Sequence, residues 1–217
     1  MASIEKFSAS SASVHLRHID REIREPSNPD IDPARSGENY DLLDHGDLTH
    51  FKYYKERLSE LNYIHRADVK TMAGWVVTAP ATLPESDHAR FFELVTDFLQ
   101  DRYGEKNGVA SVVHLDESGQ PHLHYYFIPV VPDAKNGGEK ICCKEVLTRS
   151  ELLHFHPDLQ KYLDDHGCHA AVHTGITKEL GGNKTVRELK AARAIEMAQD
   201  RWHSETITRE KEEEFVW

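Results

Sequence analysis

The chain has 217 residues, 39% of them hydrophobic and 29% charged, which is typical of one soluble globular domain with a real core. No run approaches the roughly 20 apolar residues of a membrane span, and no apolar signal core opens the chain. The three cysteines include an adjacent pair, which argues against a disulfide framework. We therefore expect a protein of the reducing cytoplasm. The formal net charge of −11 argues against a uniformly basic nucleic-acid binder, although a local basic stripe can coexist with an acidic bulk.

The first half of the chain is predicted to mix strands and helices. We expect a strand at 13–19, an extended loop at 26–40, a helix at 49–63, a buried strand at 72–79 and an amphipathic helix at 83–103. The loop contains three prolines, which break helices and favour extended backbone. Thr49 is a candidate N-cap for the first helix, and Gly104 is expected to end the second.

The central stretch, 109–132, reads as a β-hairpin, because two apolar runs flank the turn residues 118–120. If the loop is those three residues, Asp116 faces His122, His114 faces His124 and Val112 faces Tyr126. Side chains alternate along a strand, so the even-numbered residues share one face. The odd-numbered residues form an apolar core face: Val113, Leu115, Leu123, Tyr125 and Phe127.

The even-numbered face gathers His114, His122 and His124 beside Asp116 and Glu117, which predicts a metal site. Two imidazoles two residues apart on a strand can point at one ion, and a third from the paired strand completes the set. Three histidine ligands leave positions open for water or substrate, as catalytic sites require. The alternative is a chance cluster of surface histidines in a chain that has 15 of them.

Beyond the hairpin, a short strand is expected at 141–146, a helix at 148–166 and an edge strand at 168–173. Thr148 is the expected N-cap of the helix, Gly167 its stop and Pro157 a point where it kinks or divides. A loop at 178–184 then leads into a long helix from about 185. This helix carries a basic stripe that either follows phosphates or is an ordinary solvated face: Lys178, Lys184, Arg187, Lys190 and Arg193.

This order of elements predicts an α+β fold, in which helices flank a mainly antiparallel sheet that carries the hairpin in its middle. We expect residues 1–195 to form the main domain and residues 196–217 an acidic helical tail.

Two motifs resemble the Mob/Pre (MobV-type) plasmid relaxases of the HUH endonuclease superfamily. The metal motif is His114-Leu-Asp-Glu followed by Pro121-His122-Leu-His124, although the turn between Glu117 and Pro121 is one residue longer than in the family. The second motif is Asn28-Pro-Asp-Ile-Asp-Pro-Ala-Arg35-Ser36 and Asn39-Tyr40. Counted back from it, His18-Ile-Asp-Arg21 falls where the family carries His-Asn-x-Arg. The resemblance extends from about residue 13 to 193.

The resemblance implies a DNA relaxase that nicks one strand of a plasmid or mobile element at an origin of transfer. His18 would attack the phosphodiester and keep the 5′-phosphate covalently. The three histidines would hold a divalent ion, Mn²⁺ before Mg²⁺ because Mg²⁺ prefers oxygen ligands. Arg21 and Arg35 would contact phosphates, and Asp116 or Glu117 would orient a ligand histidine or activate the nucleophile. The partner would be single-stranded or supercoiled plasmid DNA, with dimerisation through a C-terminal region beyond this chain.

Three alternatives stay open from the sequence. Another HUH enzyme, such as a replication initiator or a transposase, would use Tyr40 as its nucleophile. A non-catalytic origin-binding module would keep the metal ligands without cutting, and the acidic balance favours it slightly. A small-molecule metallohydrolase would use the same three histidines without DNA.

Overall fold

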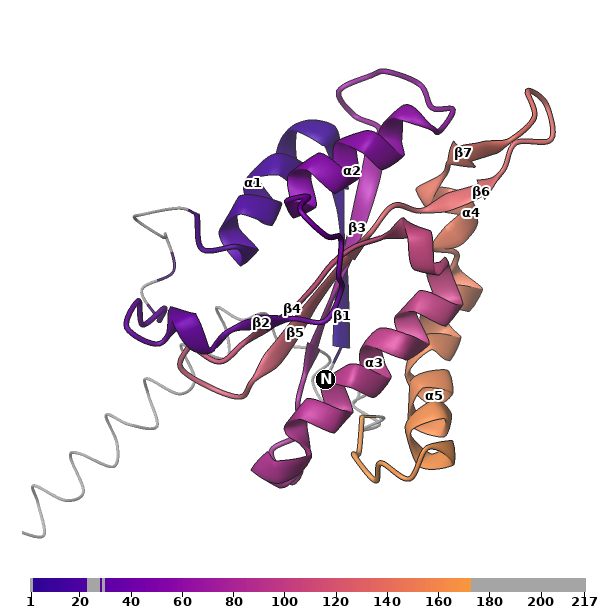
Figure 1. The fold of residues 1–217 in the computed structure, drawn as a ribbon. Helices are drawn as coiled ribbons and strands as arrows, with labels where there is room; N and C mark the ends of the chain where they lie inside the picture. The colour runs from indigo at the N-terminus through magenta and orange to yellow at the C-terminus, as the bar shows by residue number, and fades with distance from the viewer. Residues whose placement is uncertain (1, 23–27, 29, 173–217) are drawn as a thin grey trace, which may run out of the picture. The chain divides into compact units, whose positions relative to one another are not determined.

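A five-stranded antiparallel sheet in the order β1-β3-β5-β4-β2 organises the computed structural model, which describes residues 2–22, 28 and 30–172 (Figure 1). The strands are β1 Ala2–Ser8, β2 Tyr40–Asp41, β3 Lys70–Thr78, β4 Gly108–His114 and β5 His122–Phe127, and β6 Val130–Pro132 pairs with β7 Glu139–Ile141 in a separate ribbon. The helices are α1 Ala9–Ile19, α2 His50–Ser59, α3 His88–Tyr103, α4 Cys143–Val146 and α5 Arg149–Asp165. The predicted α+β class, with a mainly antiparallel sheet flanked by helices, is confirmed.

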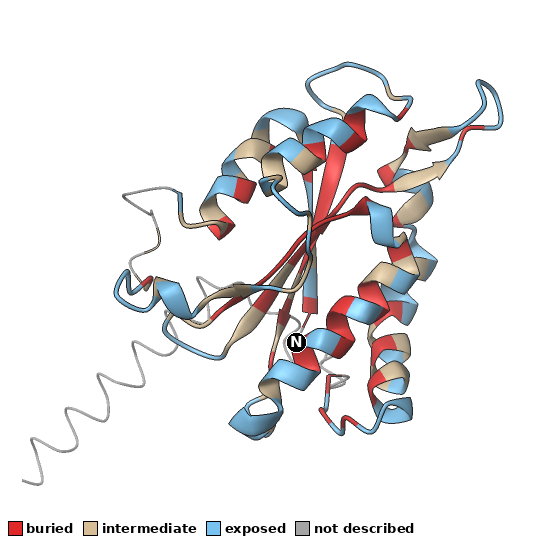
Figure 2. Ribbon diagram, in the orientation of Figure 1, coloured by how far each residue is buried: buried red, intermediate tan, exposed pale blue. Residues whose placement is uncertain are grey.

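Helices cover both faces of the sheet, as the arrangement in Figure 1 and the buried positions in Figure 2 show. Trp75, Tyr125 and Phe127 pack against α3 and α5 on one face. On the other face, Val112 and Tyr126 pack under α1 and α2. The predicted core face is therefore correct, but the even-numbered face is also a core surface along most of its length. The histidines occupy the end of that face.

The predicted helices and β3 are confirmed, although α2 ends at Ser59 and not at 63, and α3 begins at His88 and not at 83. The Thr49 hydroxyl accepts from the Lys52 amide at 3.3 Å, and the Thr148 hydroxyl accepts from the Glu151 amide at 3.1 Å. Gly104 ends α3 with φ of 89°, a conformation that favours glycine. Pro157 lies inside α5 without dividing it.

The N-terminal prediction was wrong, because 13–19 belongs to the helix α1 and not to a strand. Ala12, Leu16 and Ile19 are buried, and their spacing of four and three residues places them on one helix face. The preceding residues form β1, which pairs antiparallel with β3 and which the sequence did not predict.

Two further predicted strands after the hairpin were also wrong. Only Ile141 of the segment 141–146 lies in a strand, and α4 follows. Residues 168–172 form no strand, because the side chain of Gln160 takes up their backbone groups: it donates to Ala170 O at 3.0 Å and accepts from Val172 N at 2.9 Å.

The register of the central hairpin differs from the prediction by two residues, since His114 pairs with His122 and not with His124. The connecting loop spans 115–121 in place of 118–120. A shift of two residues leaves every side chain on its expected face, because the alternation along a strand has a period of two. The three histidines therefore stay together.

The predicted loop at 178–184, the helix from about 185, the basic stripe on it and the division at 195/196 lie outside the described residues. Among the helices of the described part, none is long and apolar enough to cross a membrane.

Candidate metal centre

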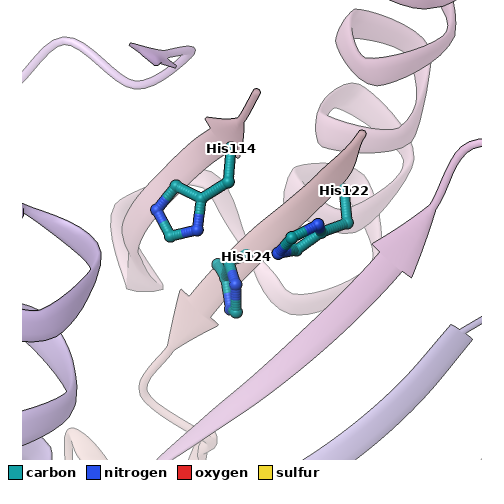
Figure 3. A group of neighbouring side chains, drawn as sticks. All are labelled: His114, His122 and His124. Carbon is teal, nitrogen blue, oxygen red and sulfur yellow. The ribbon is translucent and has the colours of Figure 1, made fainter. Parts of the chain in front are cut away.

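Three imidazoles meet where β4 ends and β5 begins (Figure 3). His114 lies directly opposite His122, and His124 is two residues further along β5 on the same face. The ring centroids are 5.5 Å apart for His114 and His122, 4.7 Å for His114 and His124, and 5.0 Å for His122 and His124. One ligand nitrogen from each ring lies within 4.8 Å of the others. This spacing suits three ligands of one ion.

Backbone carbonyls select the tautomers of two of these rings. His114 Nε2 lies 3.1 Å from Ile19 O, and His122 Nδ1 lies 3.3 Å from Gln120 O. A carbonyl only accepts, so these nitrogens carry the hydrogens. The unprotonated nitrogens, His114 Nδ1 and His122 Nε2, lie 3.6 and 4.0 Å from the Glu117 carboxylate. The lone pairs of these two nitrogens therefore face the negatively charged Glu117 carboxylate, an arrangement that is unfavourable unless a cation lies between them.

The donor set fits a cation. Within the described part of the chain, the buried nitrogens His114 Nδ1 and His124 Nδ1 have no hydrogen-bond partner, and such orphaned groups are costly. Burial lowers the pKa of His122, and it lowers the pKa of His124 well below the usual range. Neutral imidazoles are the form that binds metal. A divalent ion would satisfy the unpaired nitrogens and offset the nearby negative charge.

Arg21 binds the two carboxylates beside the histidines. It donates to Asp116 from Nε at 2.9 Å and from Nη2 at 2.6 Å, and to Glu117 from Nη2 at 2.9 Å. Burial acts to raise the pKa of Asp116, but hydrogen bonds from Arg21 and Ser36 outweigh it and lower the pKa to about 2. For Glu117, burial acts to raise the pKa, but the hydrogen bond from the Arg21 guanidinium lowers it. Both groups are carboxylates at neutral pH.

The second sequence motif packs on the hairpin loop and replaces strand pairing there. Asp32 N donates to Asp116 O at 2.8 Å, and Leu115 N donates to Asn39 Oδ1 at 2.8 Å. Ser36 Oγ donates to Asp116 Oδ2 at 2.7 Å, and Asn28 Nδ2 donates to Glu117 Oε2 at 2.9 Å. These contacts explain the longer loop, in which Asp116 does not face His122 as expected. The sequence motif contained Asn28, Ser36 and Asn39, but their positioning role was not predicted.

His18 lies in the last turn of α1, next to Ile19, whose carbonyl accepts from His114. Its ring is half-buried. Burial and the nearby Arg21 lower the pKa of His18, while Glu117 acts to raise it. The structure therefore brings His18 to the carboxylates and imidazoles of the metal centre, with its ring neutral at pH 7.

Tyr40 and Arg35 lie elsewhere. Tyr40 pairs with Val113 in β2 and packs against the core on the α3 side, so its side chain is on the sheet face opposite the histidines. Burial raises the pKa of its hydroxyl. Arg35 is half exposed and donates to Glu38 at 2.8 Å, and Lys178, Lys184, Arg187 and Lys190 lie outside the described residues.

Comparison with known proteins shows similarity to plasmid recombination enzymes over most of this chain. The family model described as plasmid recombination enzyme (Mob_Pre) matches residues 1–191. Plasmid recombination enzymes of Streptococcus agalactiae and Bacillus thuringiensis are 32% and 31% identical over 89% and 76% of this chain. These stretches cover 39% and 37% of the two relatives, so the chain spans about two fifths of their length.

A solved structure is similar over nearly its whole length. The Mn-bound MobM relaxase domain in complex with plasmid pMV158 oriT DNA is 30% identical, with a TM-score of 0.70, over 88% of this chain and 97% of that domain. A second Mn-bound crystal structure of that domain, with 22-nucleotide pMV158 oriT DNA at pH 5.5, gives a TM-score of 0.67.

Proposed function

Because the chain belongs to the plasmid recombination enzyme (Mob_Pre) family, we propose that it is a relaxase that nicks one strand of plasmid or mobile-element DNA at an origin of transfer. The observation that carries this proposal is that the last turn of α1, which holds His18, is bound through Ile19 O to His114, one of three converging imidazoles. The similar MobM domain, which is bound to oriT DNA, supports the choice of substrate. In this proposal residues 1–195 form the nicking domain, residues 196–217 form a separate acidic tail, and the protein acts in the cytoplasm, where plasmid DNA is found.

We propose that His114, His122 and His124 hold Mn²⁺. The orphaned nitrogens of two of these rings support a cation, and imidazole ligands favour a transition metal over Mg²⁺. The MobM structure is Mn-bound. When bound, the ion would supply Lewis-acid stabilisation of negative charge on the scissile phosphate.

His18 would be the nucleophile. Its pKa is lowered, so the neutral ring has a lone pair available at physiological pH. A bond would form between an imidazole nitrogen and phosphorus, and the bond from phosphorus to the 3′-oxygen would break. The 5′-phosphate would stay on His18 while the freed 3′-oxygen takes up a proton, and the reverse reaction would rejoin the strand.

Glu117 would orient the centre and would be a weak proton acceptor. Its pKa is lowered by Arg21, and a carboxylate with a lowered pKa accepts protons poorly near pH 7. Its contacts with His114, Arg21 and Asn28 support this orienting role. Arg21 would act through the same carboxylates, because its guanidinium is already engaged by them.

Tyr40 is not supported as the nucleophile, because its side chain packs on the opposite face of the sheet. The proposed DNA contacts are the exposed Arg35 and four residues outside the described part of the chain: Lys178, Lys184, Arg187 and Lys190.

The test is a cleavage assay with Mn²⁺ on labelled single-stranded oligonucleotides that tile the origin of transfer of the element carrying the gene. Wild type is expected to leave a 5′ fragment covalently bound to protein. His18→Ala should abolish that product, whereas Tyr40→Phe and the matched control His15→Ala should keep it. His15 lies one helical turn from His18 and packs against Phe7, with ring centroids 4.2 Å apart.

Metal binding is measured separately by the thermal shift with Mn²⁺ alone. A ligand that binds only the folded state raises its melting temperature. We expect that shift in wild type and in His18→Ala but not in His122→Ala. A wild-type protein that binds Mn²⁺ and cuts no origin oligonucleotide would refute the relaxase proposal in favour of an origin-binding module.

A further inference from the structure

His50 forms a link that the sequence gave no reason to expect. It is the first residue of α2, and both of its ring nitrogens bind carboxylates. Nδ1 donates to Asp20 Oδ1 at 2.7 Å, and Nε2 donates to Asp41 Oδ2 at 2.5 Å. Burial acts to lower the pKa of His50, but the two carboxylates outweigh it and raise the pKa to about 9. The ring is therefore an imidazolium that uses both of its donors at neutral pH.

The two carboxylates belong to different parts of the fold. Asp20 is the C-cap residue of α1, and its amide donates to Leu16 O at 3.1 Å. Asp41 ends β2, and its Oδ1 accepts from Leu43 N at 3.0 Å and from Ser111 N at 3.3 Å. His50 thus connects the end of α1 to the edge of the central sheet.

Three successive residues after His18 are anchored to different places. Ile19 O accepts from His114, Asp20 accepts from His50, and Arg21 donates to Asp116 and Glu117. The first and third anchors belong to the metal centre and its loop. The second anchor, from Asp20 to His50, leads through α2 to the edge of the sheet. It therefore holds the end of α1 through contacts that do not involve the metal centre.

We propose that His50 is a positioning residue, which with Asp20 and Asp41 holds the last turn of α1 so that the His18 imidazole is aimed at the scissile phosphate. The inference rests on the proposed relaxase function and deepens it. Within the described part of the chain, His50 contacts neither a metal-ligand candidate nor His18, so its effect would pass through the backbone of α1. Misplacing a reacting group by about 1 Å costs roughly 100-fold in rate.

His45 offers a matched control. It lies beside His50, with ring centroids 6.2 Å apart, and it stacks on Tyr53 with ring centroids 3.6 Å apart. Its Nε2 lies 3.0 Å from Val109 O. It is also partly buried, and none of its contacts with the described residues reaches α1.

The experiment measures single-turnover nicking at saturating oligonucleotide, together with oligonucleotide Kd and Mn²⁺ thermal shift. His50→Gln, which can donate only from one amide group, is expected to lower the nicking rate constant roughly 10- to 100-fold while Kd and the metal-induced shift stay within about twofold. Asp20→Asn should do the same, and the double variant should lose no more than either single variant, because both break one link. His45→Gln should nick at the wild-type rate.

A folded His50→Gln that nicks within about twofold of wild type would overturn the inference and leave the proposed function intact, provided that His18→Ala is inactive in the same assay. Parallel losses in rate, DNA affinity and metal binding would also overturn it, because they indicate a purely structural role. If His50→Gln does not fold, Asp41→Asn, which weakens one of the two contacts, is measured in its place against the same criteria. A wild type that does not nick would refute the proposed function itself, and this inference with it.

Discussion

Replacing Arg21 tests how strongly the carboxylates beside the metal centre depend on their cation. The Asp116 side chain has no exposed surface and the Arg21 side chain is 13% exposed. Removing one partner of a buried ion pair usually costs about 3–5 kcal/mol, because the remaining charge loses its compensation. The drop in the pKa of Asp116 from 3.8 to about 2 corresponds to about 2.5 kcal/mol. We therefore expect Arg21→Ala to lower the free energy of unfolding by about 3 kcal/mol.

Alanine is the appropriate replacement, because Arg21 has φ of 55° and a glycine would relieve that strained backbone at the same time. The matched control is Arg35→Ala. Arg35 and Glu38 form an ion pair in which both side chains are about half exposed, so its loss should cost less than about 1 kcal/mol.

The assay is urea unfolding of both variants without added metal between pH 7 and pH 2. A lowered pKa stabilises the fold above the unfolded-state value of 3.8, and the contribution is lost as the pH falls through about 2. The difference between wild type and Arg21→Ala should therefore be constant near neutral pH and narrow below about pH 4. A loss for Arg21→Ala no larger than for Arg35→Ala would refute this account of the buried pair.

Three further predictions concern stability. Gly74→Ala should destabilise the fold by about 2 kcal/mol or more in urea unfolding, because the added Cβ would lie 2.5 Å from the Tyr126 ring. The control Gly37→Ala should be nearly neutral, because no atom lies within 4 Å of the Cβ that it adds. The raised pKa of His50 stabilises the fold by about 3 kcal/mol below about pH 6.5, and this contribution should disappear as the pH rises through about 9. The free energy of unfolding of wild type and of His50→Gln should therefore converge between about pH 6.5 and about pH 9. A difference that stays constant over this range would contradict the prediction. Thr148→Ala should cost about 1 kcal/mol through the lost N-cap bond, and equal melting temperatures for it and wild type would show that the cap is dispensable.

The elements that could be predicted are those whose signals are local. Thr49 and Thr148 cap the helices that they were expected to cap, and Gly104 ends α3. The three histidines share a face because side chains alternate along each strand and the error in register was an even number of residues. Their convergence was therefore predictable even though the register was not.

The predictions that were wrong depended on contacts between residues far apart in the sequence. The hairpin was expected to close tightly, but Leu115 and Asp116 bind residues 32–39 in place of the opposite strand. The segment 13–19 was too short to show that Leu16 and Ile19 belong to a helical face that begins at the small residue Ala12. The His50 link joins residues 20, 41 and 50, and no pattern in the sequence indicates that these three meet.

The loop between β4 and β5 lies outside the ladder that joins these two strands, so the length of its tip does not set the orientation of the histidines. Residues 118–120 at its tip are exposed, whereas Asp116 and Glu117 are held by Arg21 and the segment around Asn28. Residues added at Gly119 would lengthen the exposed tip without passing through the strand ladder that orients the imidazoles. Gly119 is thus an insertion point for a fluorescent reporter or a tether close to the reacting centre, whereas Gln120 has to be kept because its carbonyl contacts His122.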